Sequence, residues 1–93
     1  MARYEVFLRR SVLRKDLARI PKRDVRRIME SICSLGDNPR PPGAGRLSGQ
    51  ERYRLRQDDY RIILSIQDDA RSVWIVKVGH RKDVYRRATR GSR

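Results

Sequence analysis

The sequence predicts an α+β fold of order β-α-α-β-β-β, with a helical hairpin packed on one face of a small antiparallel sheet. Three observations support it: apolar residues alternate near the N-terminus, recur at helical spacing over residues 11–35, and alternate again from residue 52 onward. The 93 residues, about 11 kDa, allow one domain. We place that domain at residues 1–87 and assign residues 88–93 to a short basic C-terminal tail.

Residues 3–8 form the first predicted strand, because Tyr4, Val6 and Leu8 alternate on one face. A short helix is expected next, with Ser11 as its N-cap, and a second helix after Pro21 that stops at Gly36. The apolar positions that share one side are Val12, Leu13, Leu17 and Ile20 in the first helix, and Val25, Ile28, Met29, Ile32 and Leu35 in the second.

Residues 37–50 hold three of the four prolines and three of the six glycines, which predicts a loop within one domain. Three strands are expected after it, over residues 52–57, 60–67 and 72–79, joined by short turns that make antiparallel hairpins. The last of these strands is apolar on both faces, as expected of a central strand.

The turn Asp58-Asp59 sets the register of the first hairpin and places Arg56 opposite Arg61. Side-chain alternation then puts one apolar set on the face that the helices need: Tyr53, Leu55, Tyr60, Ile62, Leu64 and Ile66. The opposite face carries Arg52, Arg54, Arg56 and Arg61. Like charges across a sheet cost about 0.2–1 kcal/mol, so this face is either a solvated surface or a site for phosphate, which fits the guanidinium fork.

The net charge of +13, from 24 basic and 11 acidic residues, favours a polyanionic partner. The single Cys33 excludes an intramolecular disulfide and a multi-cysteine zinc site, and its apolar neighbours predict a buried, inert thiol. No cofactor is expected. Because the chain lacks a stretch of roughly 20 apolar residues and a hydrophobic N-terminal segment, we expect it in the cytoplasm.

Two segments of the sequence resemble the RelE toxins of bacteria and archaea, within the wider RelE/ParE superfamily. They are Tyr53-Arg-Leu-Arg-Gln-Asp-Asp-Tyr60-Arg61-Ile-Ile-Leu and Val76-Lys-Val-Gly79-His80-Arg81-Lys-Asp-Val-Tyr85. The resemblance covers nearly the whole chain. It implies a metal-independent mRNA interferase that enters the ribosomal A site, cleaves messenger RNA by attack of a 2′-hydroxyl on the adjacent phosphate, and so inhibits translation.

The resemblance also implies roles for individual residues. Arg61 matches the arginine that holds the scissile phosphate, Arg81 the arginine proposed to protonate the leaving oxygen, and Tyr85 the tyrosine that orients or stacks on a nucleotide. Arg54 and Arg56 match two basic positions that are lysine in well-studied members. Arginine is a poor proton acceptor, so we expect the strand arginines to stabilise charge on the phosphorane.

Proton transfer is assigned to Arg81 together with His80, because histidine ordinarily titrates near neutral pH. RNA contacts outside the catalytic set are expected from Arg52, Lys82 and Arg86. The family also implies two partners: messenger RNA within the 16S ribosomal RNA of the A site, and a cognate antitoxin that orders on binding.

Two other functions stay open. A ParE-like gyrase inhibitor would share the fold without cleaving RNA, although such proteins generally lack the basic set that this chain keeps. A non-catalytic RNA- or ribosome-binding protein would also carry a charge of +13. Most of the six aromatic residues are expected on core faces, however, which leaves little surface for stacking single-stranded bases.

Overall fold

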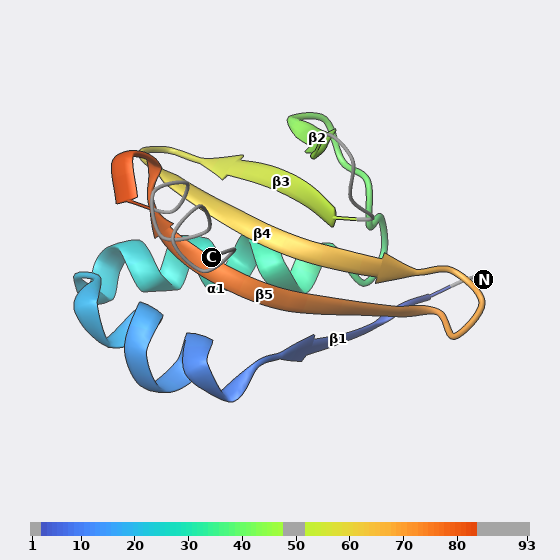
Figure 1. The fold of residues 1–93 in the computed structure, drawn as a ribbon, viewed down its shortest axis with the longest axis horizontal. Helices are drawn as coiled ribbons and strands as arrows, with labels where there is room; N and C mark the ends of the chain where they lie inside the picture. The colour runs from blue at the N-terminus through green and yellow to red at the C-terminus, as the bar shows by residue number, and fades with distance from the viewer. Residues whose placement is uncertain (1–2, 48–51, 84–93) are drawn as a thin grey trace, which may run out of the picture.

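The computed structural model describes residues 3–47 and 52–83 (Figure 1). Its first half contains β1 (Glu5–Leu8), the π-helical turn η1 (Val12–Asp16), the 3-10 turn η2 (Leu17–Arg19) and α1 (Lys22–Ser34). Its second half contains β2 (Ala44–Arg46), β3 (Arg52–Gln57), β4 (Tyr60–Gln67) and β5 (Ser72–His80). The predicted α+β class is confirmed, and the last three strands lie within one residue of their predicted bounds.

The five strands form one sheet in the order β1-β5-β4-β3-β2. The sheet is mixed and not purely antiparallel, because β1 pairs in parallel with the edge of β5. β2 is an addition within the predicted loop: it follows Gly43, whose φ is +95°, and pairs antiparallel with the outer edge of β3. That pairing covers β3 backbone groups that would otherwise be unpaired.

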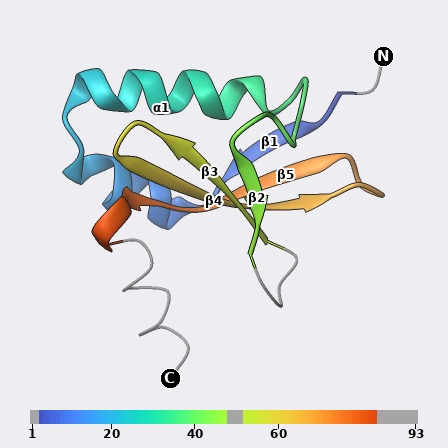
Figure 2. The same ribbon diagram turned by 90° about the horizontal axis from the view of Figure 1, so that it is seen from above.

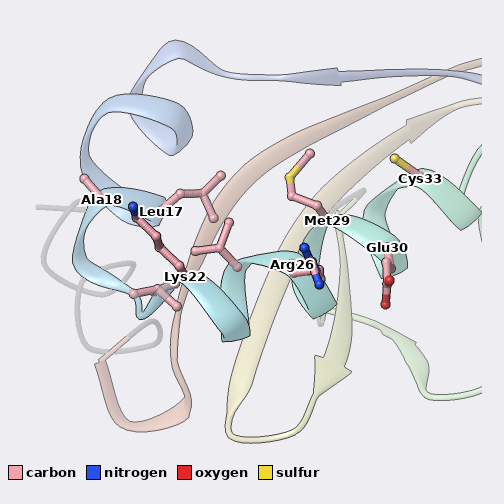
Figure 3. Close-up of a pocket in the computed structure, with 9 residues that line it drawn as sticks. Leu17, Ala18, Lys22, Arg26, Met29, Glu30 and Cys33 are labelled. Carbon is pink, nitrogen blue, oxygen red and sulfur yellow. The ribbon is translucent and has the colours of Figure 1, made fainter.

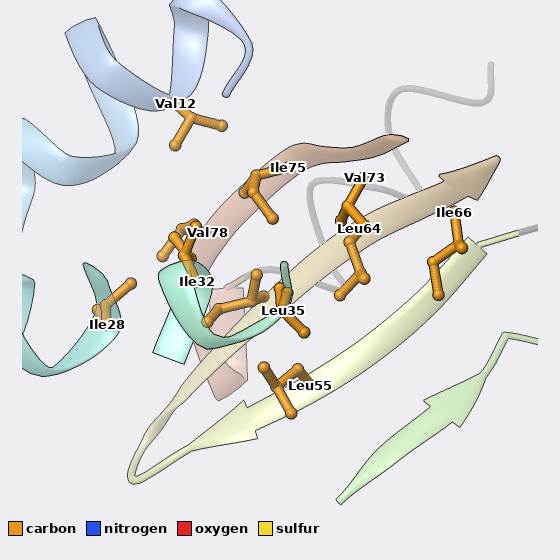
Figure 4. Packing of buried hydrophobic residues seen from close by; sticks show 11 residues of the cluster. Val12, Ile28, Ile32, Leu35, Leu55, Leu64, Ile66, Val73, Ile75 and Val78 are labelled. Atoms are coloured by element: carbon orange, nitrogen blue, oxygen red, sulfur yellow. The ribbon is translucent and has the colours of Figure 1, made fainter. Parts of the chain in front are cut away.

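One face of the sheet is covered by α1, as Figure 2 shows, and the core lies between them. Side chains from α1, η1 and β3–β5 point toward one another in this layer (Figure 4). Its buried members are Val12, Ile28, Ile32, Leu35, Leu55, Ile62, Leu64, Ile66, Val73, Ile75 and Val78. The predicted apolar face of the β3–β4 hairpin is therefore confirmed, with Tyr53 and Tyr60 packed at its margin.

The first helical segment differs from its prediction. It is not a single α-helix: the N–H of Leu17 donates to the carbonyl oxygen of Val12, which makes a wider π turn. Ser11 has helical backbone angles and makes no capping hydrogen bond through its side chain. The wide turn brings Val12 and Leu17 to the core side and leaves Leu13 55% exposed.

The prediction of a buried Cys33 is wrong, because this thiol is exposed. The core side of α1 is defined by Ile28, Ile32 and Leu35, which recur at intervals of four and three residues. Cys33 follows Ile32 by one residue, about 100° around the helix at 3.6 residues per turn, and so lies beside the core stripe. Gly36 ends the helical region where a Cβ atom would lie 3.0 Å from the carbonyl oxygen of Tyr4.

A β-bulge in β5 determines which face its last residues occupy. Leu64 of β4 pairs with Ile75, but the preceding Ile63 pairs with Lys77, so Val76 is an extra residue. The alternation consequently changes phase: Val73 and Ile75 are buried before the bulge, and Val78 is buried after it. Gly79 thereby pairs with Arg61, and His80 pairs with Tyr60.

Asp16 of η1 covers the edge of β5 beyond the end of β1. Its buried carboxylate accepts a hydrogen bond from the N–H of Val78 at 2.9 Å, and its other oxygen lies 3.8 Å from Lys77 Nζ. Among residues 3–47 and 52–83, no helix has the length and hydropathy to span a membrane. The predicted tail at residues 88–93 lies outside the described residues.

Candidate functional site

The face of the sheet opposite α1 carries the predicted arginines. The register of β3 and β4 is the predicted one: Arg56 lies opposite Arg61, Arg54 opposite Ile63, and Arg52 opposite Ser65. The alternation that buries Leu55 and Ile62 therefore places the guanidinium groups of β3 and β4 on the open face. The three strand arginines of the predicted catalytic set share this face, and Arg56 and Arg61 are direct cross-strand neighbours.

Arg61 is held by the turn that precedes it. Its Nη1 donates to the carbonyl oxygens of Asp58, at 3.1 Å, and Tyr60, at 2.9 Å. The β3–β4 turn also contacts α1, because Arg27 Nη1 of the helix lies 3.5 Å from Asp58 Oδ2. The Ser31 hydroxyl of α1 also donates to the Gln57 side chain. A guanidinium positioned in this way before a ligand arrives costs little reorganisation when negative charge develops beside it.

The other strand arginines have different surroundings. Arg54 is half-buried, and its Nη2 lies 3.4 Å from where a Cβ atom on Gly45 of β2 would be, so the glycine makes room for this guanidinium. Arg56 is exposed. Arg52 lies two residues before Arg54 on the same face, at the start of β3. The open face therefore presents guanidinium groups that differ in exposure, with Arg56 exposed and Arg52, Arg54 and Arg61 half-buried.

Arg81 directly follows β5 and is placed beside the β3–β4 turn. Its backbone N–H donates to the carbonyl oxygen of Asp59 at 2.8 Å, which brings the backbone of this residue next to the turn that joins the Arg56 and Arg61 strands. Arg81 and Lys82 are both exposed. The predicted site residues Tyr85 and Arg86 lie outside the described residues.

His80 is on the helix side of the sheet, away from the arginines. It pairs with Tyr60, and the two rings meet edge to face with centroids 6.1 Å apart. Its Nδ1 accepts a hydrogen bond from the backbone N–H of Lys82 at 3.2 Å. The Tyr60 hydroxyl donates to Asp24 of α1, and burial, followed by this hydrogen bond, raises the pKa of Tyr60. The structure thus does not bring His80 to the face that carries Arg56 and Arg61.

Two aromatic residues on the open face were missed by the sequence argument. Phe7 of β1 and Trp74 of β5 pair across the strands and stack, with ring centroids 4.8 Å apart and planes 20° from parallel. Each is 37% exposed. Tyr4, Tyr53 and Tyr60 pack against the core as expected, but Phe7 and Trp74 form an aromatic surface on the open face that was not expected. The alternation that puts Val6 and Leu8 in the core would have placed Phe7 on the opposite face.

A groove lies on the helix side, between η2 and α1 (Figure 3). It has a volume of about 850 Å³, and its floor is mostly apolar, with Leu17, Ile20, Val25 and Met29. Lys22, Arg26 and Glu30 line it as well, and Cys33 is at one end. None of the predicted site residues lines this groove.

The chemistry available on the open face is electrostatic. Within the described ranges, no three His, Cys, Asp or Glu side chains gather as they would around a metal ion. Arg54, Arg56 and Arg61 offer planar donor forks that suit phosphate oxygens. Arginine is a poor proton acceptor, so these side chains suit the stabilisation of an anion and not the role of a base.

Comparison with known proteins identifies relatives over most of the chain. Residues 7–85 match the family described as the ParE toxin of type II toxin–antitoxin systems, parDE. Toxin RelG of Mycobacterium tuberculosis is 33% identical over 78 residues, which cover 80% of this chain and 87% of that protein.

Solved structures share the fold. RelE in the RelE–RelB complex from Pyrococcus horikoshii is 31% identical, with a TM-score of 0.75 over 87% of this chain and 97% of that chain. A chain of the toxin–antitoxin complex RelBE2 from Mycobacterium tuberculosis is 25% identical, with a TM-score of 0.73 over 84% of this chain and 98% of that one.

Proposed function

Because this chain belongs to the RelE/ParE superfamily and is the toxin of a RelE-type toxin–antitoxin pair, we propose that it is an endoribonuclease that cleaves messenger RNA in the ribosomal A site. The observation that carries the proposal is the open face of β3 and β4, where Arg56 lies directly opposite Arg61 beside Arg54. Like charges this close together destabilise the sheet, and an anionic ligand that neutralises them would remove this cost.

The reaction we propose is a transesterification within the RNA. The 2′-hydroxyl gives its proton to a water molecule and its oxygen forms a bond to the adjacent phosphorus, while the bond from phosphorus to the 5′-oxygen breaks. The products are a 2′,3′-cyclic phosphate and a 5′-hydroxyl. Negative charge accumulates on the phosphate oxygens in between. Arg61, fixed by the turn carbonyls, and the neighbouring Arg54 and Arg56 stabilise that charge. Arg81 supplies the proton that the leaving 5′-oxygen takes up, and its guanidinium regains a proton from water.

Two further parts of the proposal concern partners. Relatives have been solved in complexes of RelE with RelB, and we propose that a cognate antitoxin binds this chain too. The groove between η2 and α1 offers an apolar surface flanked by Lys22 and Arg26, which suits an amphipathic segment with acidic margins. The net charge of +13 suits an RNA-rich environment such as the ribosomal A site.

A gyrase inhibitor is the second candidate, since the matching family is that of ParE toxins. One pair of assays separates the two. Purified protein is added to ribosomes programmed with a defined messenger, and the 5′ ends of the fragments are mapped. The same preparation is added to gyrase in a supercoiling assay. We expect cleavage in the A-site codon and unimpaired supercoiling. Inhibited supercoiling with an intact messenger would replace the nuclease by the gyrase inhibitor.

A further inference from the structure

We propose that the stacked pair Phe7–Trp74, with Arg9 and Arg52, forms a subsite that binds one unpaired RNA nucleotide beside the arginine cluster. The pair occupies one end of a row that runs straight across the open face. Phe7 pairs with Trp74, Trp74 with Ser65, and Ser65 with Arg52. The row therefore joins an aromatic platform at β1 and β5 to a guanidinium group at β3.

The surface of the sheet at this subsite forms a shallow cavity. This cavity of about 460 Å³ lies over the row, lined by Arg9, Arg52, Ser65, Gln67, Trp74 and Val76. That volume is within the roughly 300–1,000 Å³ typical of small-ligand sites. Arg9 is placed by its backbone, whose N–H donates to the carbonyl oxygen of Ile75 at 3.1 Å. Within the described residues, neither Arg9 nor Arg52 makes an ion pair with a carboxylate.

Each component matches one part of a nucleotide. The Trp74 indole lines the hollow and is 37% exposed, and the face that Phe7 does not cover can stack a base. Such stacking has little preference for the identity of the base, because every base has a π-face. Two guanidinium groups at the rim suit the flanking phosphates. The Gln67 amide and the Ser65 hydroxyl face the same hollow and can hydrogen-bond to a base edge. A protein partner would be expected to bury apolar side chains here, and the two arginines disfavour that alternative.

The subsite lies close enough to the arginine cluster for one RNA strand to occupy both. Ser65 and Arg61 are four residues apart on one face of β4, about 13 Å at roughly 3.3 Å per residue. A single strand whose phosphate lies at Arg61 would thus reach Trp74 with a nearby nucleotide. The inference rests on the proposed function for its choice of RNA, but it concerns binding and can be tested without cleavage.

Trp74 is the only tryptophan in the chain, so its fluorescence reports stacking directly. The probes are a single-stranded 2′-O-methyl RNA of ten nucleotides, which lacks the attacking hydroxyl, and an abasic oligonucleotide of the same length and charge. We expect the first to quench the fluorescence and the second to bind at least tenfold more weakly without quenching. Equal quenching by both, or none by either, would overturn the subsite.

Variants supply the second measurement, with labelled 2′-O-methyl RNA and fluorescence anisotropy. Trp74→Ala should weaken binding about 10- to 100-fold, and Trp74→Phe should restore most of it. Arg9→Ala should reduce the slope of log affinity against log salt by about one. Leu13→Ala, at an exposed apolar residue on the helix side, is the matched control and should bind like the parent. Unchanged affinity in Trp74→Ala would contradict the proposal.

The outcomes separate the subsite from the nuclease. Quenching by RNA without cleavage on programmed ribosomes would leave the subsite and remove the proposed function. Cleavage on programmed ribosomes, with tryptophan fluorescence unaffected by RNA, would support the nuclease and overturn the subsite. Quenching by polyglutamate to the same extent as by RNA would show that the surface responds to any polyanion and would overturn the subsite.

Discussion

The two faces of the sheet are made by the same strands but are constrained differently. On the helix side, Leu55, Ile62 and Leu64 are buried against α1, and their identities follow from packing. On the open side, the residues one step away along the same strands are Arg54, Arg56 and Arg61. No helix of the described chain packs over them, so packing does not explain them. The comparison indicates that packing against α1 accounts for the residues of the helix side but not for the strand arginines of the open face.

The largest expected effect comes from Arg61→Ala on the open face. Loss of a fixed donor to a developing anion typically lowers turnover about 100- to 1,000-fold. We expect a loss of this size in messenger cleavage on programmed ribosomes. The urea midpoint should change little, because the hydrogen bonds of the Arg61 side chain to other described residues are to turn carbonyls. Arg71→Ala, at an exposed turn away from the cluster, is the control. Full cleavage by Arg61→Ala would remove Arg61 from the catalytic set.

Ile62→Ala is the matching change on the helix side, one residue further along β4. Ile62 is fully buried, so truncation should lower the free energy of unfolding by about 2–5 kcal/mol through lost burial and a cavity. Urea denaturation measures this. At a temperature where the variant is still folded, its cleavage rate should stay near that of the parent. A large loss of cleavage in the folded variant would show that the two faces are not independent.

Asp16→Ala tests the contact that fixes the end of β5. The change leaves the buried N–H of Val78 without an acceptor and should cost about 1–3 kcal/mol of stability. Asp16→Asn keeps an oxygen in the same position and should cost less. Urea denaturation of both variants distinguishes the lost hydrogen bond from the lost volume. Equal destabilisation by Ala and Asn would mean that the hydrogen bond to Val78 contributes little.

Asp68 belongs to neither face. Its replacement is expected to have a smaller effect on stability, and one that depends on pH. Arg40 donates to both of its oxygens, at 3.2 and 3.0 Å, and Tyr4 donates at 2.6 Å. The hydrogen bonds from Arg40, and then from Tyr4, lower the pKa of the Asp68 carboxyl in the folded state. The corresponding stability is present above the ordinary carboxyl pKa and is lost as pH falls through the lowered one. Thermal melts from pH 6 to pH 2 should show a shallower decline in Asp68→Asn than in the parent.

His80→Ala should have the smallest effect on cleavage. The sequence suggested a role in proton transfer, but the side chain packs against Tyr60 on the helix side. We therefore expect the cleavage rate of His80→Ala to follow that of the parent from pH 6 to pH 9. A loss of activity confined to one side of that range would return His80 to the proton-transfer role.

The hairpin was predictable because two local signals agreed. Alternation in residues 52–57 and 60–67 gives the faces, and the short Asp58-Asp59 turn gives the register, so Arg56 opposite Arg61 required no tertiary information. Asp58 adopts a φ of +54°, a region that aspartate tolerates better than most residues. The arginine face therefore follows from the order of residues along the chain.

The remaining features depend on tertiary structure. The bulge at Val76 reverses the alternation along β5 and moves His80 to the helix side, and nothing in Ser72–His80 marks it. Likewise, the apolar residues of β1 show which face is buried but not which edge of the sheet the strand joins. Leu13 and Cys33 were misplaced because each is only one residue away from a buried position, and helical spacing alone tolerates both assignments.

The parallel pairing of β1 with β5 has a consequence for the order in which the protein is made. Glu5 pairs with Ser72, so β1 has no partner in the described sheet until β5 has been synthesised. At about 5–20 residues per second, this delay lasts seconds. Contacts so distant in sequence also slow folding once the chain is released. We therefore expect each new molecule to be incompletely folded for a short time after synthesis. During that time the β3–β4 hairpin can form, but β1 has not yet joined the sheet.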